Sequence, residues 1–149
     1  MSGDSLSIPP QPAPDPDSEG FWRATADGAL ALCRCVECRS WLQPPLERCR
    51  RCAGMTRFER VMGRGTVFSF IVARHPCCPG YLDAVPYVVA LVELDEQAGL
   101  RLPARITGVA PDRVRIGQRV RAEIIDLPGG AYRIPVFRVE EPEGSEEPA

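Results

Sequence analysis

The alternation of apolar and polar positions divides the chain into an irregular beginning, a cysteine-rich segment and a β-rich second half. Five short runs are dominated by β-branched and aromatic residues, and turn residues separate them. We expect strands over Thr66–Ala73, Tyr87–Leu94, Leu100–Ile106, Arg119–Leu127 and Arg133–Val139. Five strands of this length are typical of a small, partly open barrel of the OB type. Pro103 and Pro135 are then expected at strand edges or bulges, because proline donates no ladder hydrogen bond.

The beginning of the chain predicts one short helix. Ser18 is expected to cap it, and Gly28 to end it. Residues 1–18 hold five prolines and no periodic apolar pattern, which predicts a disordered lead. Phe21 and Trp22 lie in the helix and have two interpretations: they pack on their own domain, or they anchor a partner protein, since aromatic side chains dominate binding hot spots. Tyr81, in the loop after the first barrel strand, is a further candidate for partner contact.

Between the helix and the barrel lie two Cys-x-x-Cys pairs, Cys35/Cys38 and Cys49/Cys52, with ten residues between them. Each pair places two thiols on one side of a tight turn, so that two such turns supply four ligands to one tetrahedral ion. This spacing is typical of one structural Zn²⁺, whose closed four-thiolate shell leaves no position for substrate. Disulfides and a rubredoxin-type iron site are the alternatives.

Three further cysteines and the single histidine need a separate interpretation. Cys33 is too close to Cys35 to form a knuckle with it, so we interpret it as a buried or idle thiol, with replacement of Cys35 as the alternative. His75, Cys77 and Cys78 invite a second metal site or a Cys/His nucleophile. Vicinal cysteines do not easily chelate one ion, and no partner carboxylate is evident, so we favour a mobile surface loop. Phosphate-loop, GxSxG and HExxH motifs are absent, and the sequence makes no positive case for an enzyme.

Composition narrows the class of protein. The apolar fraction of 44% and the charged fraction of 26% are typical of soluble globular proteins. No run of apolar residues is long enough to span a bilayer, and the N-terminus lacks the basic start and apolar core of a secretory signal. Seven cysteines in such a chain favour a reducing compartment, so we expect a cytoplasmic protein.

Charge is unevenly distributed along the chain. All eighteen basic residues are arginine; eight of them fall in residues 33–64 against three glutamates, and the last ten residues hold five glutamates. The basic ribbon either steers an anionic partner or keeps the surface soluble. Nucleic-acid binding is a competing hypothesis, with Phe68 and Phe70 as a stacking platform on one strand face. A pI near 5.5 opposes it.

Four stretches of the sequence carry a family resemblance. They read LALCRCVECRSWLQPPLERCRRC, GRGTVFSFIVA, PYVVALVELDE and IGQRV, and they resemble the OB-fold proteins with a rubredoxin-like N-terminal zinc ribbon. This family was formerly of unknown function and is associated with acyl-CoA enzymes. The resemblance runs from about Phe21 to Val139 and implies zinc ligands at Cys35, Cys38, Cys49 and Cys52. Arg39 and Ala53 stand where relatives often have glycine, which favours the tight turn of a knuckle.

The resemblance also implies an organisation and a function. We divide the chain into a disordered lead (1–18), the helix and zinc ribbon (19–63), the OB-fold (64–139) and a disordered acidic tail (140–149). The implied role is that of a non-catalytic subunit beside a thiolase, a lipid-transfer-protein-type aldolase or a hydratase that acts on acyl-CoA, including in steroid side-chain breakdown. The subunit would stabilise its partner enzyme and assist CoA binding, but no particular arginine is assigned to CoA. A single-stranded nucleic-acid binder and an iron-based electron carrier are the alternatives.

Overall fold

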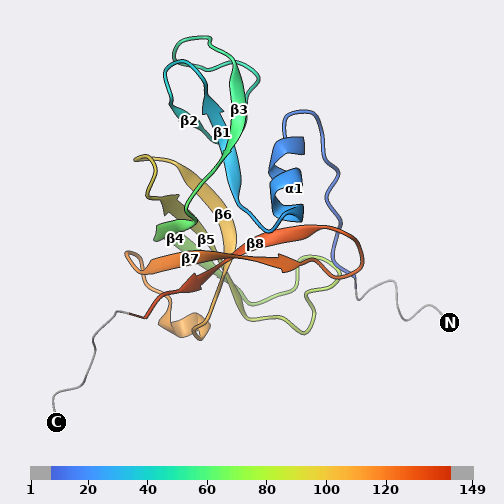
Figure 1. Cartoon of the computed structure of the whole chain (residues 1–149). Coiled ribbons are helices and arrows are strands. Elements are labelled where there is room, and N and C mark those ends of the chain that lie inside the picture. Colours follow the sequence, from blue (N-terminus) through green and yellow to red (C-terminus); the bar gives the residue numbers. More distant parts are fainter. Residues whose placement is uncertain (1–7, 142–149) are drawn as a thin grey trace.

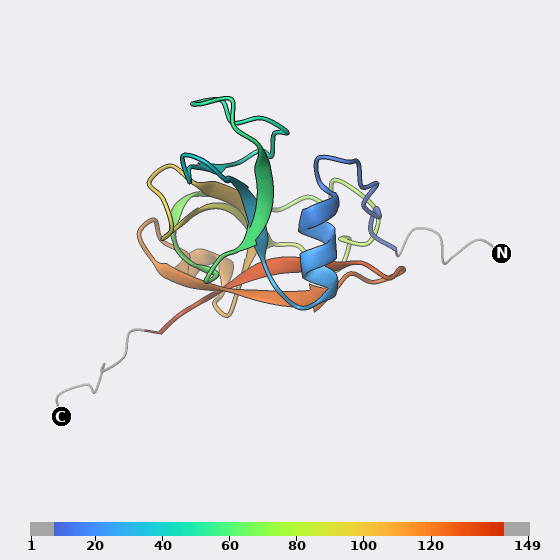
Figure 2. The same cartoon turned by 45° about the horizontal axis from the view of Figure 1, so that its top comes forward.

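The computed structural model describes residues 8–141, and within them it forms a short helix, two sheets and one 3-10 turn. The elements are α1 (Glu19–Ala26), β1 (Ala31–Cys35), β2 (Trp41–Leu42), β3 (Thr56–Arg60), β4 (Arg64–Ala73), β5 (Tyr87–Leu94), β6 (Arg101–Thr107), η1 (Pro111–Arg113), β7 (Arg119–Asp126) and β8 (Arg133–Val139). One sheet has the order β2-β1-β3, and the other is a closed barrel in the order β4-β5-β6-β8-β7 (Figures 1 and 2). The predicted mainly β class, with a helix and a cysteine-rich unit before an OB-like barrel, is confirmed.

Local signals place the two ends of α1. Ser18 occupies the N-cap position but makes no side-chain bond to the helix; instead, its backbone N–H donates to the Asp15 carboxylate at 2.8 Å. Gly28 ends the helix in the left-handed conformation, with φ of 79°. The N–H groups of Gly28 and Ala29 donate to the Thr25 and Ala24 carbonyls, which completes a Schellman cap. No helix among residues 8–141 combines the length and the apolar character that crossing a membrane requires.

The small sheet is held together by few apolar residues. β1 pairs antiparallel with both β2 and β3, so that Cys33 lies between Leu42 and Phe58. Cys33, Cys35, Leu42 and Cys49 are buried together, and Phe58 packs against them. A core of this size contributes little stability, so the ribbon depends on contacts beyond its own apolar residues.

The barrel closes along a short seam. β6 and β8 run parallel and pair only at Ile106 with Phe137 and at Thr107 with Arg138. Pro103 of β6 pairs with β5, and Pro135 of β8 pairs with β7. Neither proline takes part in the pairing between β6 and β8. Neither proline therefore interrupts a second ladder, and the expected edge positions agree with the structure even though the barrel is closed.

One hydrophobic core serves both sheets. Leu30, Leu32 and Trp41 from the ribbon side pack with barrel residues such as Phe137. The Trp41 side chain is only 6% exposed. Its backbone N–H donates to Gln97 Oε1 at 2.9 Å, and its carbonyl accepts from Gln97 Nε2 at 3.1 Å. Because Gln97 lies between β5 and β6, its amide fixes β2 against the barrel as a paired strand would.

Residues 8–18 follow a defined path, whereas the sequence predicts a disordered lead. Pro9 is buried, and a Cβ added to Gly80 would lie 2.7 Å from the Pro9 Cα. Gln11 Nε2 donates to the Pro128 carbonyl at 2.9 Å. These partners are distant in the sequence, so no local pattern signals them. Residues 1–7 and 142–149, which the sequence analysis also assigned to disordered ends, lie outside the described residues.

The shared core generates a first prediction. Trp41→Ala should lower the free energy of unfolding by about 3–5 kcal/mol, because it removes a buried aromatic ring that joins ribbon and barrel. Denaturant unfolding followed by circular dichroism measures this loss. Met62→Ala is the matched control, because the Met62 side chain is 79% exposed and its removal should cost at most about 0.5 kcal/mol. Equal stabilities of the two variants would contradict the role of Trp41.

Candidate metal centre

The two Cys-x-x-Cys turns meet at the tip of the ribbon. The Sγ atoms of Cys35, Cys38, Cys49 and Cys52 all lie within 4.8 Å of one another. Across the two turns, Cys35 Sγ lies 3.4 Å from Cys52 Sγ, and Cys38 Sγ lies 3.6 Å from Cys49 Sγ. Cys35 and Cys49 are buried, whereas Cys38 and Cys52 are exposed. The four thiols can therefore hold one metal ion at a half-covered site.

This donor set fits a tetrahedral ion. A metal–sulfur bond of about 2.3 Å requires sulfur atoms about 3.8 Å apart, which is close to the separations across the turns. Backbone N–H groups of Cys38 and Arg51 point at the Cys35 and Cys49 sulfurs at 3.4 and 3.3 Å, and they would stabilise negative thiolates. Four protein ligands complete the coordination, so the centre can organise the fold but offers no position for substrate.

Both turns need a residue in the left-handed conformation, and neither uses glycine for it. Arg39 has φ of 65° and Ala53 has φ of 61°. The Ala53 N–H donates to the Cys49 carbonyl at 2.8 Å, and the Cys35 N–H donates to the Ser40 carbonyl at 2.9 Å. The turns thus form without glycine, at a cost in backbone strain.

The thiols ionise unequally when no cation balances them. The Ser40 hydroxyl and the Ser40 backbone N–H lower the pKa of Cys38 to about 6. For Cys52, the Gly54 N–H acts to lower the pKa, but hydrogen bonding with Cys35 and desolvation raise it to about 12. Hydrogen bonding among the thiols thus favours the thiolate of Cys38 and disfavours that of Cys52, and a bound cation would stabilise all four thiolates.

The remaining thiols lie outside this cluster. Cys33 is buried beneath it, with its Sγ 3.5 Å from the Leu46 carbonyl, which agrees with its interpretation as a buried thiol. Cys77 Sγ lies 3.7 Å from Cys78 Sγ and 3.8 Å from the Tyr87 hydroxyl, in the loop between β4 and β5. Within residues 8–141, the only group of three or more metal-ligating side chains is the cluster of Cys35, Cys38, Cys49 and Cys52.

The predicted partner-binding aromatics lie partly buried on their own domain. Phe21 packs against the main core. Trp22 meets Phe21 edge to face at 5.0 Å, and it meets Tyr132 at 5.6 Å. Tyr81 packs on Tyr87, with ring centroids 5.4 Å apart. All three rings keep part of their surface exposed, but Phe21 has a clear structural role in the core.

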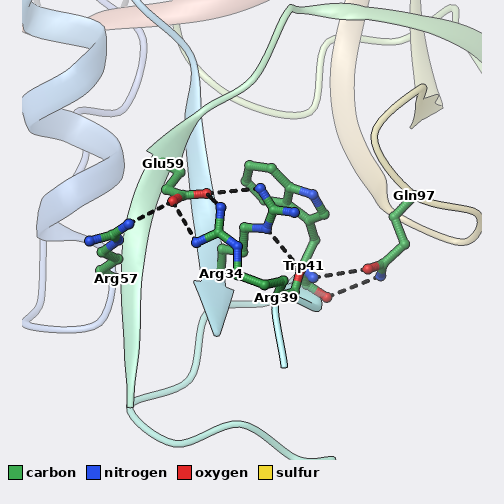
Figure 3. A network of polar contacts seen from close by, with 6 residues as sticks. All are labelled: Arg34, Arg39, Trp41, Arg57, Glu59 and Gln97. Carbon is green, nitrogen blue, oxygen red and sulfur yellow. Dashed lines mark hydrogen bonds and ion pairs between the residues drawn. The ribbon is translucent and has the colours of Figure 1, made fainter. Parts of the chain in front are cut away.

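Sequence reasoning missed a charge network that supports the first knuckle. Glu59, on β3, pairs with Arg34, Arg39 and Arg57 at 3.0, 3.0 and 2.9 Å (Figure 3). The hydrogen bond from Arg57 lowers the pKa of Glu59 most; desolvation opposes it, and Arg34 and Arg39 lower the pKa further, to about 2. The pairing ties the Arg39 side chain, which follows the first knuckle, to β3. Alternation along β3 gave no sign of this network, because Glu59 lies on the face opposite to Phe58, which packs against the cysteine cluster.

The same network reaches the barrel. The Arg34 guanidinium lies over the Trp41 ring at 4.5 Å, and Trp41 is in turn held by Gln97 (Figure 3). A cation above an aromatic face is attracted to it, and the contact also covers the ring. The metal-binding tip, the small sheet and the barrel are thereby joined through consecutive contacts.

The proposed stacking platform for nucleic acid does not form as the sequence suggested. A β-bulge between Val67 and Ser69 shifts the alternation of β4. Phe68 is therefore exposed, with the Arg101 guanidinium over its ring at 3.6 Å, whereas Phe70 packs against the core. The expectation that the two rings share one strand face was wrong, because the bulge adds one residue between their positions.

Comparison with known proteins gives a family match in the barrel and relatives over most of the chain. A family model described as ChsH2, C-terminal OB-fold domain, matches residues 59–124. A probable enoyl-CoA hydratase alpha subunit from Thermomonospora curvata is 37% identical over 134 residues, which cover 89% of this chain and 40% of that protein. A 3-oxo-4,17-pregnadiene-20-carboxyl-CoA hydratase alpha subunit from Mycobacterium tuberculosis is 53% identical over 66 residues, which cover 44% of this chain and 20% of that protein. The chain thus spans less than half of the length of either relative.

A solved structure agrees over nearly the whole fold. A chain of the Ltp2-ChsH2(DUF35) aldolase superposes on this one with a TM-score of 0.78 at 35% sequence identity. The superposition covers 87% of this chain and 98% of that chain, so it includes more than the barrel alone.

The geometry of the cluster predicts the effect of removing one ligand. Cys35→Ser or Cys49→Ser should release the metal and unfold the ribbon, because a four-thiolate site of this kind contributes about 10–16 kcal/mol in small peptides. Elemental analysis, counting zinc and iron separately, together with thermal unfolding, measures both effects. Cys77→Ser and Cys78→Ser are the controls and should keep metal content and stability. Full metal retention in a Cys35 or Cys49 variant would contradict the assignment.

Proposed function

Because the chain belongs to the ChsH2/DUF35 family of OB-fold proteins, we propose that it is a non-catalytic accessory subunit of a thiolase-like or lipid-transfer-protein-type aldolase complex. The similarity to a chain of the Ltp2-ChsH2(DUF35) aldolase carries this proposal, since this chain covers 98% of that one at 35% identity. The complex would act on acyl-CoA thioesters, because the hydratase subunits that resemble this chain are named for CoA substrates. A steroid acyl-CoA is one candidate within that class.

The site chemistry supports a subunit that stabilises its partner and does no bond chemistry itself. A four-thiolate ion has no open position for substrate. The contacts that the structure gives for the nearby Cys77 thiol are with Cys78 and the Tyr87 hydroxyl rather than with a histidine base. We therefore place catalysis in the partner subunit and assign to this chain a role in folding and positioning that partner, with assistance in CoA binding as a further part of the role.

We propose zinc as the metal of the four-cysteine centre. Zn²⁺ has no redox chemistry and no geometric preference of its own, and it suits a closed tetrahedral thiolate site that joins two turns. Iron bound to four thiolates would instead give a coloured electron carrier. The elemental analysis of the unmodified protein, as described for the cysteine variants, decides between the two metals.

The complex itself is the direct test of the proposed function. Co-expression with a thiolase-like or aldolase subunit from the same genome should yield one species that co-purifies through size-exclusion chromatography. The partner expressed alone should be less soluble or less active, because its contact surface would be left uncovered. Two proteins that migrate independently would refute the proposal.

Trp22 and Tyr81 are the aromatic side chains that we propose for contact with the partner. Trp22→Ala should weaken the complex by about 2 kcal/mol, as expected for an interfacial aromatic anchor, and should leave the metal content unchanged. Phe21→Ala is the matched comparison: it should lower the stability of the isolated protein by about 2 kcal/mol, because Phe21 packs against the core. Calorimetric titration of the partner and thermal unfolding separate the two effects. Normal partner binding by the Trp22 variant would place the docking surface elsewhere.

A further inference from the structure

Three neighbouring strands place arginines side by side on the outer surface of the barrel. Arg64 on β4 is the Cα partner of Arg121 on β7, and Arg121 is the Cα partner of Arg138 on β8. All three residues are exposed, and the strands that carry them are adjacent in the barrel (Figure 1). We call Arg64, Arg121 and Arg138 the arginine row.

This arrangement does not contribute to the stability of the chain. Like charges directly opposite on paired strands repel each other and destabilise the sheet. Within residues 8–141, none of the three arginines forms an ion pair. The neighbouring Arg119 provides the contrast, since its guanidinium binds both oxygens of Asp95, at 2.8 and 2.6 Å. The arginine row thus carries positive charge that no ion pair within residues 8–141 neutralises.

The row borders an open hollow of about 1240 Å³. Six arginines and three glutamates line it, together with Val109, Val139 and Gln118. Apart from the row, these charged lining residues are Arg113, Arg115, Arg119, Glu123, Glu140 and Glu141. The excess of positive charge in a concave surface raises the local concentration of anions.

The shape and lining of the hollow favour a polypeptide over a small ligand. A small-molecule site is typically an enclosed, mainly apolar pocket that buries most of its ligand. This hollow is open, its apolar side chains are two valines, and no aromatic residue lines it. Carboxylates are already accommodated beside it, as Asp95 shows by its bidentate pairing with Arg119. Neighbouring strands lie about 4.8 Å apart. The arginines of the row therefore repeat at nearly the spacing of about 5–6 Å that separates side chains on successive turns of a helix.

We propose that the arginine row is the docking surface for an acidic segment of a partner polypeptide. The guanidinium forks would bind its carboxylates in pairs, and the segment would neutralise the repulsion between the three arginines. The inference deepens the proposed function, on which it rests for the identity of the partner subunit. It is separate from the aromatic contacts at Trp22 and Tyr81, and it adds an electrostatic contact at a second place on the chain.

The test uses the full-length, metal-loaded chain and a fluorescein-labelled oligoglutamate peptide. Fluorescence anisotropy at low salt should show binding that weakens steeply as the salt concentration rises. Arg121→Gln with Arg138→Gln should weaken binding about tenfold, since two exposed ion pairs are lost. Arg50→Gln with Arg51→Gln removes the same charge from the exposed second knuckle and should leave affinity within about twofold. Arg64→Gln alone is the second variant, should the double variant lose its fold.

Each outcome decides the inference. Selective loss in the row variants, and a matching loss of co-purification with the partner subunit, supports it. Equal weakening in the row and knuckle variants would show non-specific attraction, and absence of peptide binding at low salt would also overturn it. Row-dependent binding of tripolyphosphate without peptide binding would make the hollow a phosphate site instead. Because the peptide assay needs no partner subunit, its failure is distinguishable from failure of the proposed complex to form.

Discussion

The position of Trp41 in the core of the barrel is the constraint on which the arrangement of this protein depends. The ribbon buries only a handful of small and medium-sized side chains of its own. It can gain stability at one end from four thiols that are placed to hold a metal ion, and at the other from an indole ring that the barrel covers. The Gln97 side-chain amide accepts from the backbone N–H of Trp41 and donates to the Trp41 carbonyl. Together these contacts turn two small units into one body, with the metal-binding tip held at a defined distance from the barrel.

The charge network around Glu59 explains how the first knuckle tolerates a residue other than glycine. Arg39 takes up a left-handed backbone that costs on the order of 1 kcal/mol. Its side chain then shares the Glu59 carboxylate with Arg34 and Arg57. The side-chain contact and the left-handed backbone thus occur at the same residue of the first knuckle. A cysteine cluster supported in this way suits a structural role, because the first knuckle is held by side-chain ion pairs as well as by backbone hydrogen bonds.

The arginines of the ribbon and the barrel include two groups with different physical roles. One group is engaged within the chain: Arg34 covers Trp41 and binds Glu59, and Arg119 binds Asp95. The arginine row belongs to the other group, which forms no ion pair among the described residues. A subunit that works by binding another protein needs such unmatched groups, since internal pairing would leave nothing for the partner to recognise.

The sequence by itself determined what depends on neighbours in the chain. Thiol spacing predicted the four ligands as a set that the structure brings together, and local alternation placed β5 and β8 to the residue. Tertiary structure decided everything that depends on strand register between distant segments. It brought three arginines to Glu59, placed a bulge that separates Phe68 from Phe70, and aligned the arginine row across β4, β7 and β8. A shift of one residue in any of these pairings would move each side chain to the opposite face, and no pattern within a single strand specifies that register.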